Sequence, residues 1–145
     1  AQARELTRPI CQKYGVTLYT DCRISTLVVD GDLICSALVN LIENSAKASF
    51  PGGAIWLRAG ETGFTVEDRG RGIPPQDLHR VTDPFYMGDP SRSKSTGGFG
   101  LGLALVREVA LAHGGTLDLE STEGIGTTAR ILLQDRNGNQ TVMGR

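Results

Sequence analysis

The sequence has little of what would mark a membrane protein, a nucleic-acid binder or a disulfide-rich module. No apolar run approaches the roughly 18–20 residues that span a bilayer, and no secretory signal peptide is visible at the start of the chain. Lys and Arg together number 15 and Asp and Glu 16, so the net charge is −1. That balance argues against nucleic-acid binding driven by electrostatics, and we expect no nucleic-acid partner and no membrane contact.

Cysteine is also scarce, because Cys11, Cys22 and Cys35 form an odd set without a CxxC pair. A disulfide framework or a zinc site is therefore not expected. Reduced thiols fit a cytoplasmic location, although the sequence leaves open whether a longer parent protein is anchored in a membrane. Glycine, by contrast, is abundant: 19 of 145 residues, against a usual share of about 7%. The glycines are clustered, which indicates specialised loops rather than disorder.

Hydrophobic spacing predicts helices interspersed with strands. Helices are expected over 3–15, from Asp30 or Asp32 to about Ser49, over 74–81, and from the glycine cluster to about His113. Strands are expected over 16–23, 25–30, 54–61, 63–69, 115–122 and 126–134. Pro9 fits only the first turn of its helix or a kink. Because the strands mostly come as hairpin pairs, the pattern favours an α/β (α+β) fold with helices on one face of a mainly antiparallel sheet.

The helix that ends near Ser49 carries polar residues in register. Asn40, Asn44 and Lys47 are spaced i, i+4, i+7 and share one helix face. Two amides and an ammonium group on one face could coordinate a hydrated Mg²⁺ and hold phosphate oxygens. The simpler alternative is a solvated polar face. The core face is expected to carry Leu38, Leu41 and Ile42.

The segment "GGFGLGL" places bare backbone N–H groups at the start of a helix. The first turn of a helix has unpaired N–H donors and a partial positive charge, so it binds phosphate readily. The segment matches neither a Walker loop nor the dinucleotide fingerprint, because Leu103 stands where the latter needs its third glycine. Residues 83–99, just before it, have no hydrophobic period, and such long loops are often functional lids. A flexible connection remains the alternative.

A third feature is "VEDRGRGIPP", which places Asp68 at the end of a strand. A carboxylate there can accept a hydrogen bond from an exocyclic amine such as that of adenine. Gly70, two residues on, would let a base lie against the backbone. An ordinary Asp-led turn is the alternative for this feature alone.

Together these segments resemble the catalytic ATP-binding domain of sensor histidine kinases, within the superfamily of gyrase, chaperone and mismatch-repair ATPases. "NLIENSAK" is similar to the asparagine box, "DRGRGIP" to the first glycine box, "DPFYMGDPSRS" to the phenylalanine box and "GGFGLGLAL" to the second glycine box. The resemblance covers roughly 29–133. It implies a two-layer α/β sandwich of the Bergerat type, with ATP and Mg²⁺ as cofactors.

The resemblance also implies residue roles. Asn44 would ligate Mg²⁺, Asn40 and Lys47 would meet the phosphates, and Asp68 would bind the adenine amino group. The remaining expected nucleotide contacts are Gly70, Gly72 and Ile73 at the pocket floor, Phe85, Arg92 and Lys94 in the lid over 83–99, Gly98, Gly100, Leu101 and Gly102 at the phosphates, and Thr127, which would reach adenine through water. Residues 1–134 would form this catalytic domain and 135–145 a polar tail.

Three positions depart from the family pattern. Thr82 replaces a phenylalanine that often anchors the lid, Ala48 replaces an aromatic residue that stacks on the base, and Ser45 replaces the usual alanine. The family phosphorylates a histidine in a His-Glu-type motif on a separate helical hairpin, and neither His79 nor His113 has those neighbours. His113 is expected to be a helix cap or surface residue. The expected partners are thus the dimerisation and phosphoacceptor domain of the parent kinase and, through it, a response regulator.

Several alternatives to a histidine kinase domain remain. Hydrolytic relatives place a water-activating glutamate four residues before the metal-binding asparagine, where this chain has Asn40. A serine kinase that inhibits a sigma factor shares the boxes but usually has a shorter lid. A degenerate domain that binds nucleotide only to scaffold partners is the third alternative, and it would show no phosphotransfer.

Overall fold

The computed structural model describes residues 2–23, 29–60, 62–78 and 99–133. In chain order these residues form α1 (Gln2–Tyr14), β1 (Thr17–Cys22), α2 (Gly31–Ala48), β2 (Ala54–Gly60), β3 (Gly63–Asp68), α3 (Pro75–Leu78), α5 (Phe99–Ala112), β4 (Thr116–Thr122) and β5 (Gly126–Leu132). None of the helices in these ranges is long and apolar enough to cross a membrane.

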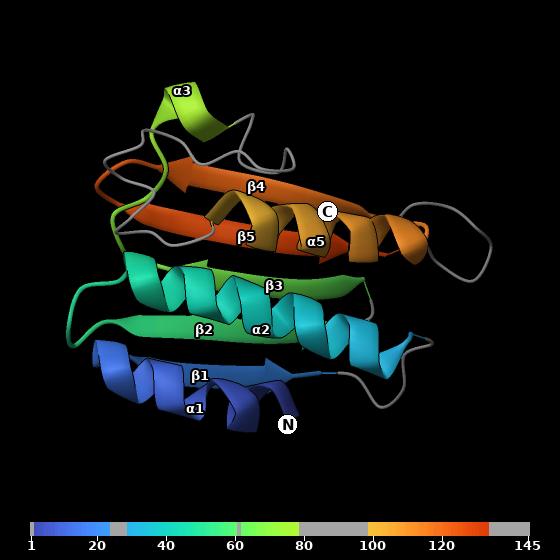
Figure 1. Ribbon diagram of the computed structural model, residues 1–145, viewed down its shortest axis with the longest axis horizontal. Coiled ribbons are helices and arrows are strands. Elements are labelled where there is room, and N and C mark those ends of the chain that lie inside the picture. The colour runs from blue at the N-terminus through green and yellow to red at the C-terminus, as the bar shows by residue number, and fades with distance from the viewer. Residues whose placement is uncertain (1, 24–28, 61, 79–98, 134–145) are drawn as a thin grey trace.

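The strands form one five-stranded sheet in the order β1-β2-β3-β5-β4. β1 and β2 pair in parallel, whereas the other neighbouring strands are antiparallel. The helices α1, α2 and α5 lie side by side over one face of this sheet (Figure 1). The predicted two-layer sandwich with a mixed, mainly antiparallel sheet is therefore confirmed.

Helix α2 begins where the sequence indicated. Asp30 is its N-cap, and the Asp30 carboxylate accepts hydrogen bonds from the backbone N–H groups of Asp32 and Leu33, which have no partner within the helix. The strand predicted over 25–30 is not seen in its described part, because Val29 and Asp30 lie outside any strand; residues 25–28 lie outside the described residues.

The core lies between the helices and the sheet. The predicted core residues of α2, Leu38, Leu41 and Ile42, are all buried. They belong to one hydrophobic cluster with sheet residues such as Ile55 and Ile131. Each such side chain contributes about 1.5–3 kcal/mol when removed from water. This layer fixes α2 over the sheet and so positions the polar residues of that helix.

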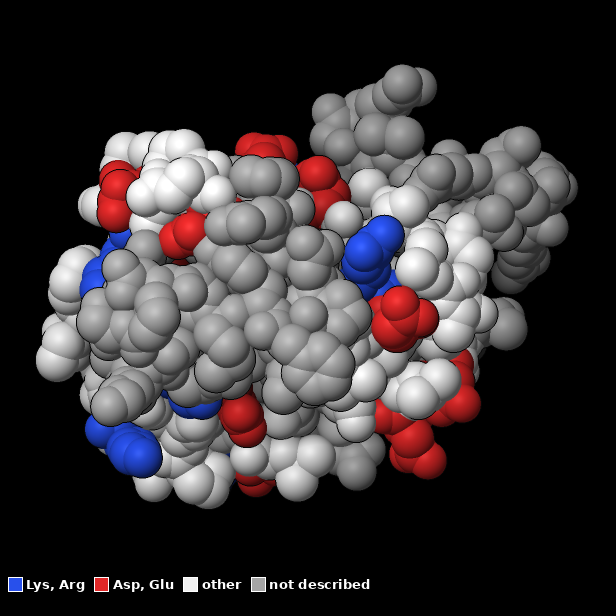
Figure 2. Space-filling model, turned by 45° about the horizontal axis from the view of Figure 1, so that its top comes forward, with Lys and Arg blue, Asp and Glu red and all other residues white. Residues whose placement is uncertain are grey.

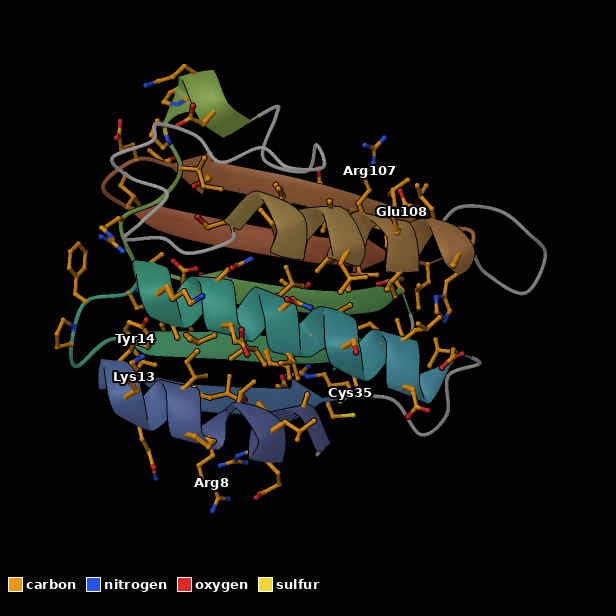
Figure 3. The ribbon with its side chains drawn as sticks, in the orientation of Figure 1. Arg8, Lys13, Tyr14, Cys35, Arg107 and Glu108 are labelled. Atoms are coloured by element: carbon orange, nitrogen blue, oxygen red, sulfur yellow. The ribbon has the colours of Figure 1, made fainter. Side chains whose placement is uncertain are left out.

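The outer surfaces of the helices carry charged side chains together with exposed leucines such as Leu6, Leu105 and Leu111. Arg107 and Glu108 lie on α5 (Figure 3), and both are exposed. On the face drawn in Figure 2, acidic and basic side chains are interspersed. Pro9 lies inside α1 rather than in its first turn, so the Glu5 carbonyl lacks the N–H that an ordinary helical residue would donate to it.

Candidate functional site

A narrow pocket lies between α2, the sheet and α5. Its polar lining consists of Asn44, Ser45, Asp68 and Thr127, and its backbone and apolar lining of Leu41, Ala48, Gly72, Ile73, Leu103, Leu119 and Ala129. The pocket therefore draws on α2, the end of β3, the loop after it, α5, β4 and β5. Its volume is about 30 Å³, which has room for a water molecule but not for a purine. A base could enter only if the walls moved apart.

Asp68 is the charged group of this pocket, and its side chain is 3% exposed. Burial raises the pKa of its carboxyl group above 3.8, because the charged form loses its water. Hydrogen bonds from the Gly70 N–H, the Ser45 hydroxyl and the Thr127 N–H act in the opposite direction, and Glu67 nearby adds a smaller upward effect. The Gly70 N–H donates to Asp68 Oδ1 at 2.9 Å. Three protein donors thus converge on one buried carboxylate.

Asn44 contributes an amide that has no protein partner for its nitrogen. Asn44 Nδ2 is buried and makes no hydrogen bond among the described residues. Leaving such a donor unpaired costs about 1–3 kcal/mol, and orphaned groups of this kind often mark ligand sites. A ligand with acceptor oxygens would satisfy the nitrogen, while the carbonyl oxygen of the same amide is the type of ligand that Mg²⁺ prefers.

Asn40 and Lys47 lie one turn before and about one turn after Asn44 on α2. Neither lines the narrow pocket. Asn40 Nδ2 donates to the Ser36 carbonyl at 2.9 Å, so this amide is bound to its own helix. The Lys47 carbonyl accepts a hydrogen bond from the Arg71 guanidinium. Of the three residues predicted on one polar face, the structure brings Asn44 alone into the pocket lining.

The loop from Gly70 to Ile73 is wedged between α2 and the β4–β5 hairpin. A Cβ on Gly70 would lie 2.2 Å from the Ala48 carbonyl oxygen, and one on Gly72 would lie 2.2 Å from the Thr122 carbonyl oxygen. Gly72 also has a φ of +72°, which favours glycine. The glycines predicted to form the pocket floor are therefore required by close backbone contacts on both sides.

The second glycine cluster leads into α5, which begins at Phe99. Gly100, Leu101 and Gly102 form the first turn, where backbone N–H groups have no intrahelical partner. This position agrees with the predicted helix start. The other lid and phosphate residues, Phe85, Arg92, Lys94 and Gly98, lie outside the described residues, as do His79 and Thr82.

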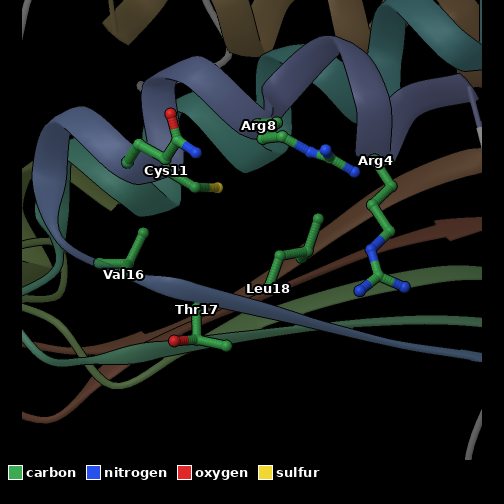
Figure 4. A pocket seen from close by; sticks show the side chains of 7 residues that line it. Arg4, Arg8, Cys11, Val16, Thr17 and Leu18 are labelled. Carbon is green, nitrogen blue, oxygen red and sulfur yellow. The ribbon is translucent and has the colours of Figure 1, made fainter.

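Two larger pockets lie beside α1, and their lining residues differ from those of the narrow pocket. One, of about 390 Å³, lies between α1 and β1 and is lined by Arg4, Arg8 and Cys11 among others (Figure 4). The second, of about 520 Å³, reaches from α1 to Phe64. Neither contains a residue predicted to bind nucleotide. Size alone therefore does not single out a candidate site, whereas a buried carboxylate beside an unpaired amide makes the narrow pocket the candidate.

The sequence did not reveal the apolar walls or the role of Ser45. Leu103, Leu119 and Ala129 complete the walls, and no motif assigned these three residues to a site. Ser45 seemed a minor departure from alanine. In the structure it is 7% exposed, and its hydroxyl hydrogen-bonds to Asp68.

A sequence model of the family described as histidine kinase-, DNA gyrase B-, and HSP90-like ATPase matches residues 29–137. The sensor-like histidine kinase SenX3 of Mycobacterium tuberculosis is 42% identical over 115 residues, which are 75% of this chain and 28% of SenX3. The sensor histidine kinase WalK of Bacillus subtilis is 39% identical over 111 residues, 72% of this chain and 18% of WalK. This chain thus corresponds to a minor part of these curated relatives.

Solved structures are similar over most of the chain. The mycobacterial sensor histidine kinase MprB superposes with a TM-score of 0.69 at 30% identity, covering 88% of this chain and 87% of that chain. Full-length ShkA, solved in complex with AMPPNP, gives a TM-score of 0.70 at 26% identity over 89% of this chain and 27% of that chain.

Proposed function

Because this chain belongs to the histidine kinase-, DNA gyrase B-, and HSP90-like ATPase family, we propose that it binds Mg·ATP and transfers the γ-phosphate to a histidine of a separate helical phosphoacceptor domain. The observation that carries this proposal is the buried Asp68 carboxylate in the same pocket as the unpaired amide of Asn44. The identity of 42% with the sensor-like histidine kinase SenX3 favours this member of the family over a serine kinase or a scaffold.

The carboxylate of Asp68 suits the amino group of adenine. A carboxylate has about four lone-pair positions. Gly70, Ser45 and Thr127 each donate one hydrogen bond to it, which leaves about one position for a further donor. The exocyclic amine of adenine would supply that donor, whereas guanine presents a carbonyl oxygen there. We therefore propose adenine as the preferred base.

The phosphate side of the site would be formed by Asn44 and the start of α5. The described residues contain no group of three or more His, Cys, Asp or Glu side chains that could hold a metal by itself. Mg²⁺ commonly binds through one or two protein oxygens together with substrate phosphates and water, and Asn44 suits that arrangement. Bound Mg²⁺ would neutralise phosphate charge as the γ-phosphoryl group leaves ADP. Lys47, Arg92 and Lys94 would add positive charge.

Asn40 bears on the choice between transfer and hydrolysis. A neutral amide cannot take a proton from water, and here it is bound to the Ser36 carbonyl. A histidine acceptor carries its own nucleophilic nitrogen and needs less activation. Phosphate transfer to such a residue would rely on positioning and charge neutralisation. The acceptor domain would belong to the longer parent protein, which would pass the phosphate to a response regulator in two-component signalling, with this domain in the cytoplasm.

Calorimetry tests the binding half of the proposal. Wild-type protein should bind Mg·ATP, and EDTA should weaken the binding. Asn44→Ala should lower Mg·ATP affinity about 10- to 150-fold, the range for a hydrogen bond to a charged group. Glu43→Ala is the matched control, because Glu43 is adjacent on α2 but does not line the pocket. Equal ATP affinity with and without EDTA in the wild type would contradict the metal role.

Phosphotransfer tests the other half. The chain alone should bind ATP without labelling itself, and should hydrolyse it slowly. Mixed with the helical hairpin of its parent kinase, it should label that hairpin with an acid-labile, base-stable phosphate. The rate should be low, because separate chains lose the effective concentration that a tether supplies. Asn40→Glu should raise hydrolysis relative to transfer. Acid-stable label would instead indicate a serine kinase.

A further inference from the structure

Ser121, at the end of β4, joins three parts of the pocket through one hydroxyl group. Its Oγ accepts a hydrogen bond from the Ile73 N–H at 2.7 Å. The same oxygen lies 3.0 Å from the Gly126 carbonyl oxygen and 2.8 Å from Thr127 Oγ1. Ser121 does not line the pocket, but Ile73 and Thr127 do. Its side chain therefore stands directly behind two lining residues.

Counting protons restricts how the Thr127 hydroxyl can point. The Ile73 N–H can only donate, so it occupies one lone pair of Ser121 Oγ, and Ser121 has a single proton to give. If that proton goes to the Gly126 carbonyl, Thr127 must donate to Ser121 and is left with acceptor lone pairs. If it goes to Thr127, the proton of Thr127 is free to donate into the pocket. In both cases one hydrogen bond of the Thr127 hydroxyl goes to Ser121, which restricts the orientation of that hydroxyl.

The same serine helps to hold the loop that forms the pocket floor. The Gly124 N–H donates to the Arg71 carbonyl at 2.6 Å, and the Ile73 N–H donates to Ser121. The loop is thus bound to the β4–β5 hairpin at two points, one through backbone and one through the Ser121 side chain. Ile73 is 3% exposed, so its N–H would have little access to water if Ser121 lost its hydroxyl.

We propose that Ser121 is a positioning residue for base recognition, acting through the Thr127 hydroxyl. This inference rests on the proposed function, in which the base lies beside Asp68 and Thr127. Among the described residues, the hydrogen bonds of the Ser121 side chain go to Ile73, Gly126 and Thr127, and none goes to Asn44. Loss of the Ser121 hydroxyl should therefore weaken ADP and ATP binding by the same factor.

The test is a double-mutant cycle read by calorimetry on the full chain. Ser121→Ala should weaken both Mg·ATP and Mg·ADP binding about three- to tenfold, the range for one hydrogen bond. In a Thr127→Ala background the same change should have a clearly smaller effect, because the group through which Ser121 acts is gone. Thr122→Ala, an exposed neighbour on β4, is the control and should leave affinity unchanged.

Urea unfolding of the same proteins separates positioning from support of the fold. Ser121→Ala should cost stability in both backgrounds, because the hydrogen bond from the Ile73 N–H is lost in both, and the cost should be smaller in Thr127→Ala only by the Ser121–Thr127 hydrogen bond. Equal fold-losses of ATP affinity in both backgrounds would overturn the inference. If Ser121→Ala does not fold, Ser121→Cys keeps a weaker donor and acceptor and should show the same dependence on Thr127. Wild-type protein that binds neither ATP nor ADP would overturn the proposed function itself.

Discussion

His113 Nε2 accepts a hydrogen bond from the backbone N–H of Asp30 at 2.9 Å, which ties the end of α5 to the N-cap of α2. The other ring nitrogen, Nδ1, lies 2.8 Å from the Val109 carbonyl oxygen and must carry the proton, because a carbonyl can only accept. The geometry therefore requires a neutral imidazole with its proton on Nδ1. The histidine expected to be a helix cap or surface residue does bind a carbonyl in the last turn of α5, and it is also a clamp between two helices.

Removing this clamp should destabilise the fold. His113→Ala loses two hydrogen bonds and should lower the free energy of unfolding by about 1–3 kcal/mol, measured by urea denaturation. Asp30→Ala should cost about 1 kcal/mol by loss of the N-cap, and the double variant should cost less than the sum. Arg107→Ala, an exposed change on α5, should stay within about 0.5 kcal/mol. A ¹⁵N spectrum showing the proton on Nε2 would contradict the assigned contacts.

ATP affinity should depend on pH through Asp68. The adenine amine needs the ionised carboxylate as its acceptor, and burial raises the pKa of Asp68. Affinity should therefore fall as pH is lowered through that raised pKa, at a higher pH than an ordinary aspartate would give. Calorimetric titrations across a pH series measure the midpoint. Asp68→Asn corrects for titration of ATP itself, and an identical pH profile in this variant would exclude Asp68 as the titrating group.

Ser45 should set where that midpoint lies. The Ser45 hydroxyl stabilises the ionised carboxylate and lowers the pKa of Asp68 against the effect of burial. Ser45→Ala should therefore raise the pKa of Asp68 further and move the midpoint of ATP affinity to higher pH. Ser49→Ala is a suitable control, because Ser49 Oγ donates to the Ser45 carbonyl rather than to Asp68. An unshifted midpoint in Ser45→Ala would mean that this hydroxyl does not act on the carboxylate.

The stability of the nucleotide-free protein should also depend on pH through Asp68, and the raised pKa sets the direction of that dependence. A carboxyl group whose pKa is raised in the folded state favours folding when protonated. That contribution is fully present below about 3.8, the unfolded value, and is lost as pH rises through the folded pKa. The unfolding free energy of the wild type relative to Asp68→Asn should therefore decrease with rising pH over that window. Urea titrations of both proteins measure this difference, and an increase with pH would contradict the assigned direction.

Gly72 should tolerate no side chain. Gly72→Ala combines a φ of +72° with a Cβ 2.2 Å from the Thr122 carbonyl oxygen. Gly52→Ala is the matched control, since Gly52 has a φ of +85° but nothing within 4 Å of its Cβ. The control should cost about 1–2 kcal/mol from backbone strain alone, and Gly72→Ala should cost more and also weaken ATP binding. Equal losses of stability in Gly72→Ala and Gly52→Ala would mean that the loop moves away from the added Cβ with no loss of free energy.

Features set by local sequence could be predicted. The start of α2, its core face and the β4–β5 hairpin depend on neighbours within a few residues, and the spacing of Leu38, Leu41 and Ile42 was enough to orient the helix. The strand order was beyond local reasoning. The insertion of β5 between β3 and β4, and the parallel pairing of β1 with β2, depend on contacts between distant segments.

The same distinction applies to the site. Asn44 and Asp68 were candidates by residue type and Thr127 by resemblance to the family, and the structure brings these three together in one pocket. The sequence grouped Asn40 with them because helical spacing reports a shared face, not which part of that face meets the pocket. The hydrogen bonds of Ser45 with Asp68 and of Ser121 with Ile73 were missed because each joins segments far apart in the chain.

The position of β5 between β3 and β4 bears on when the proposed site is completed during synthesis. β4 pairs with β5, and β3 pairs with β5 on the side away from β2, so that the strand made last among the described ones joins the two. Until ribosomes have extended the chain past Leu132, Asp68 lacks the Thr127 N–H and the pocket lacks a wall. A nucleotide that binds the proposed site could therefore do so only after β5 has formed, and it would stabilise the completed fold rather than guide the earlier part of the nascent chain.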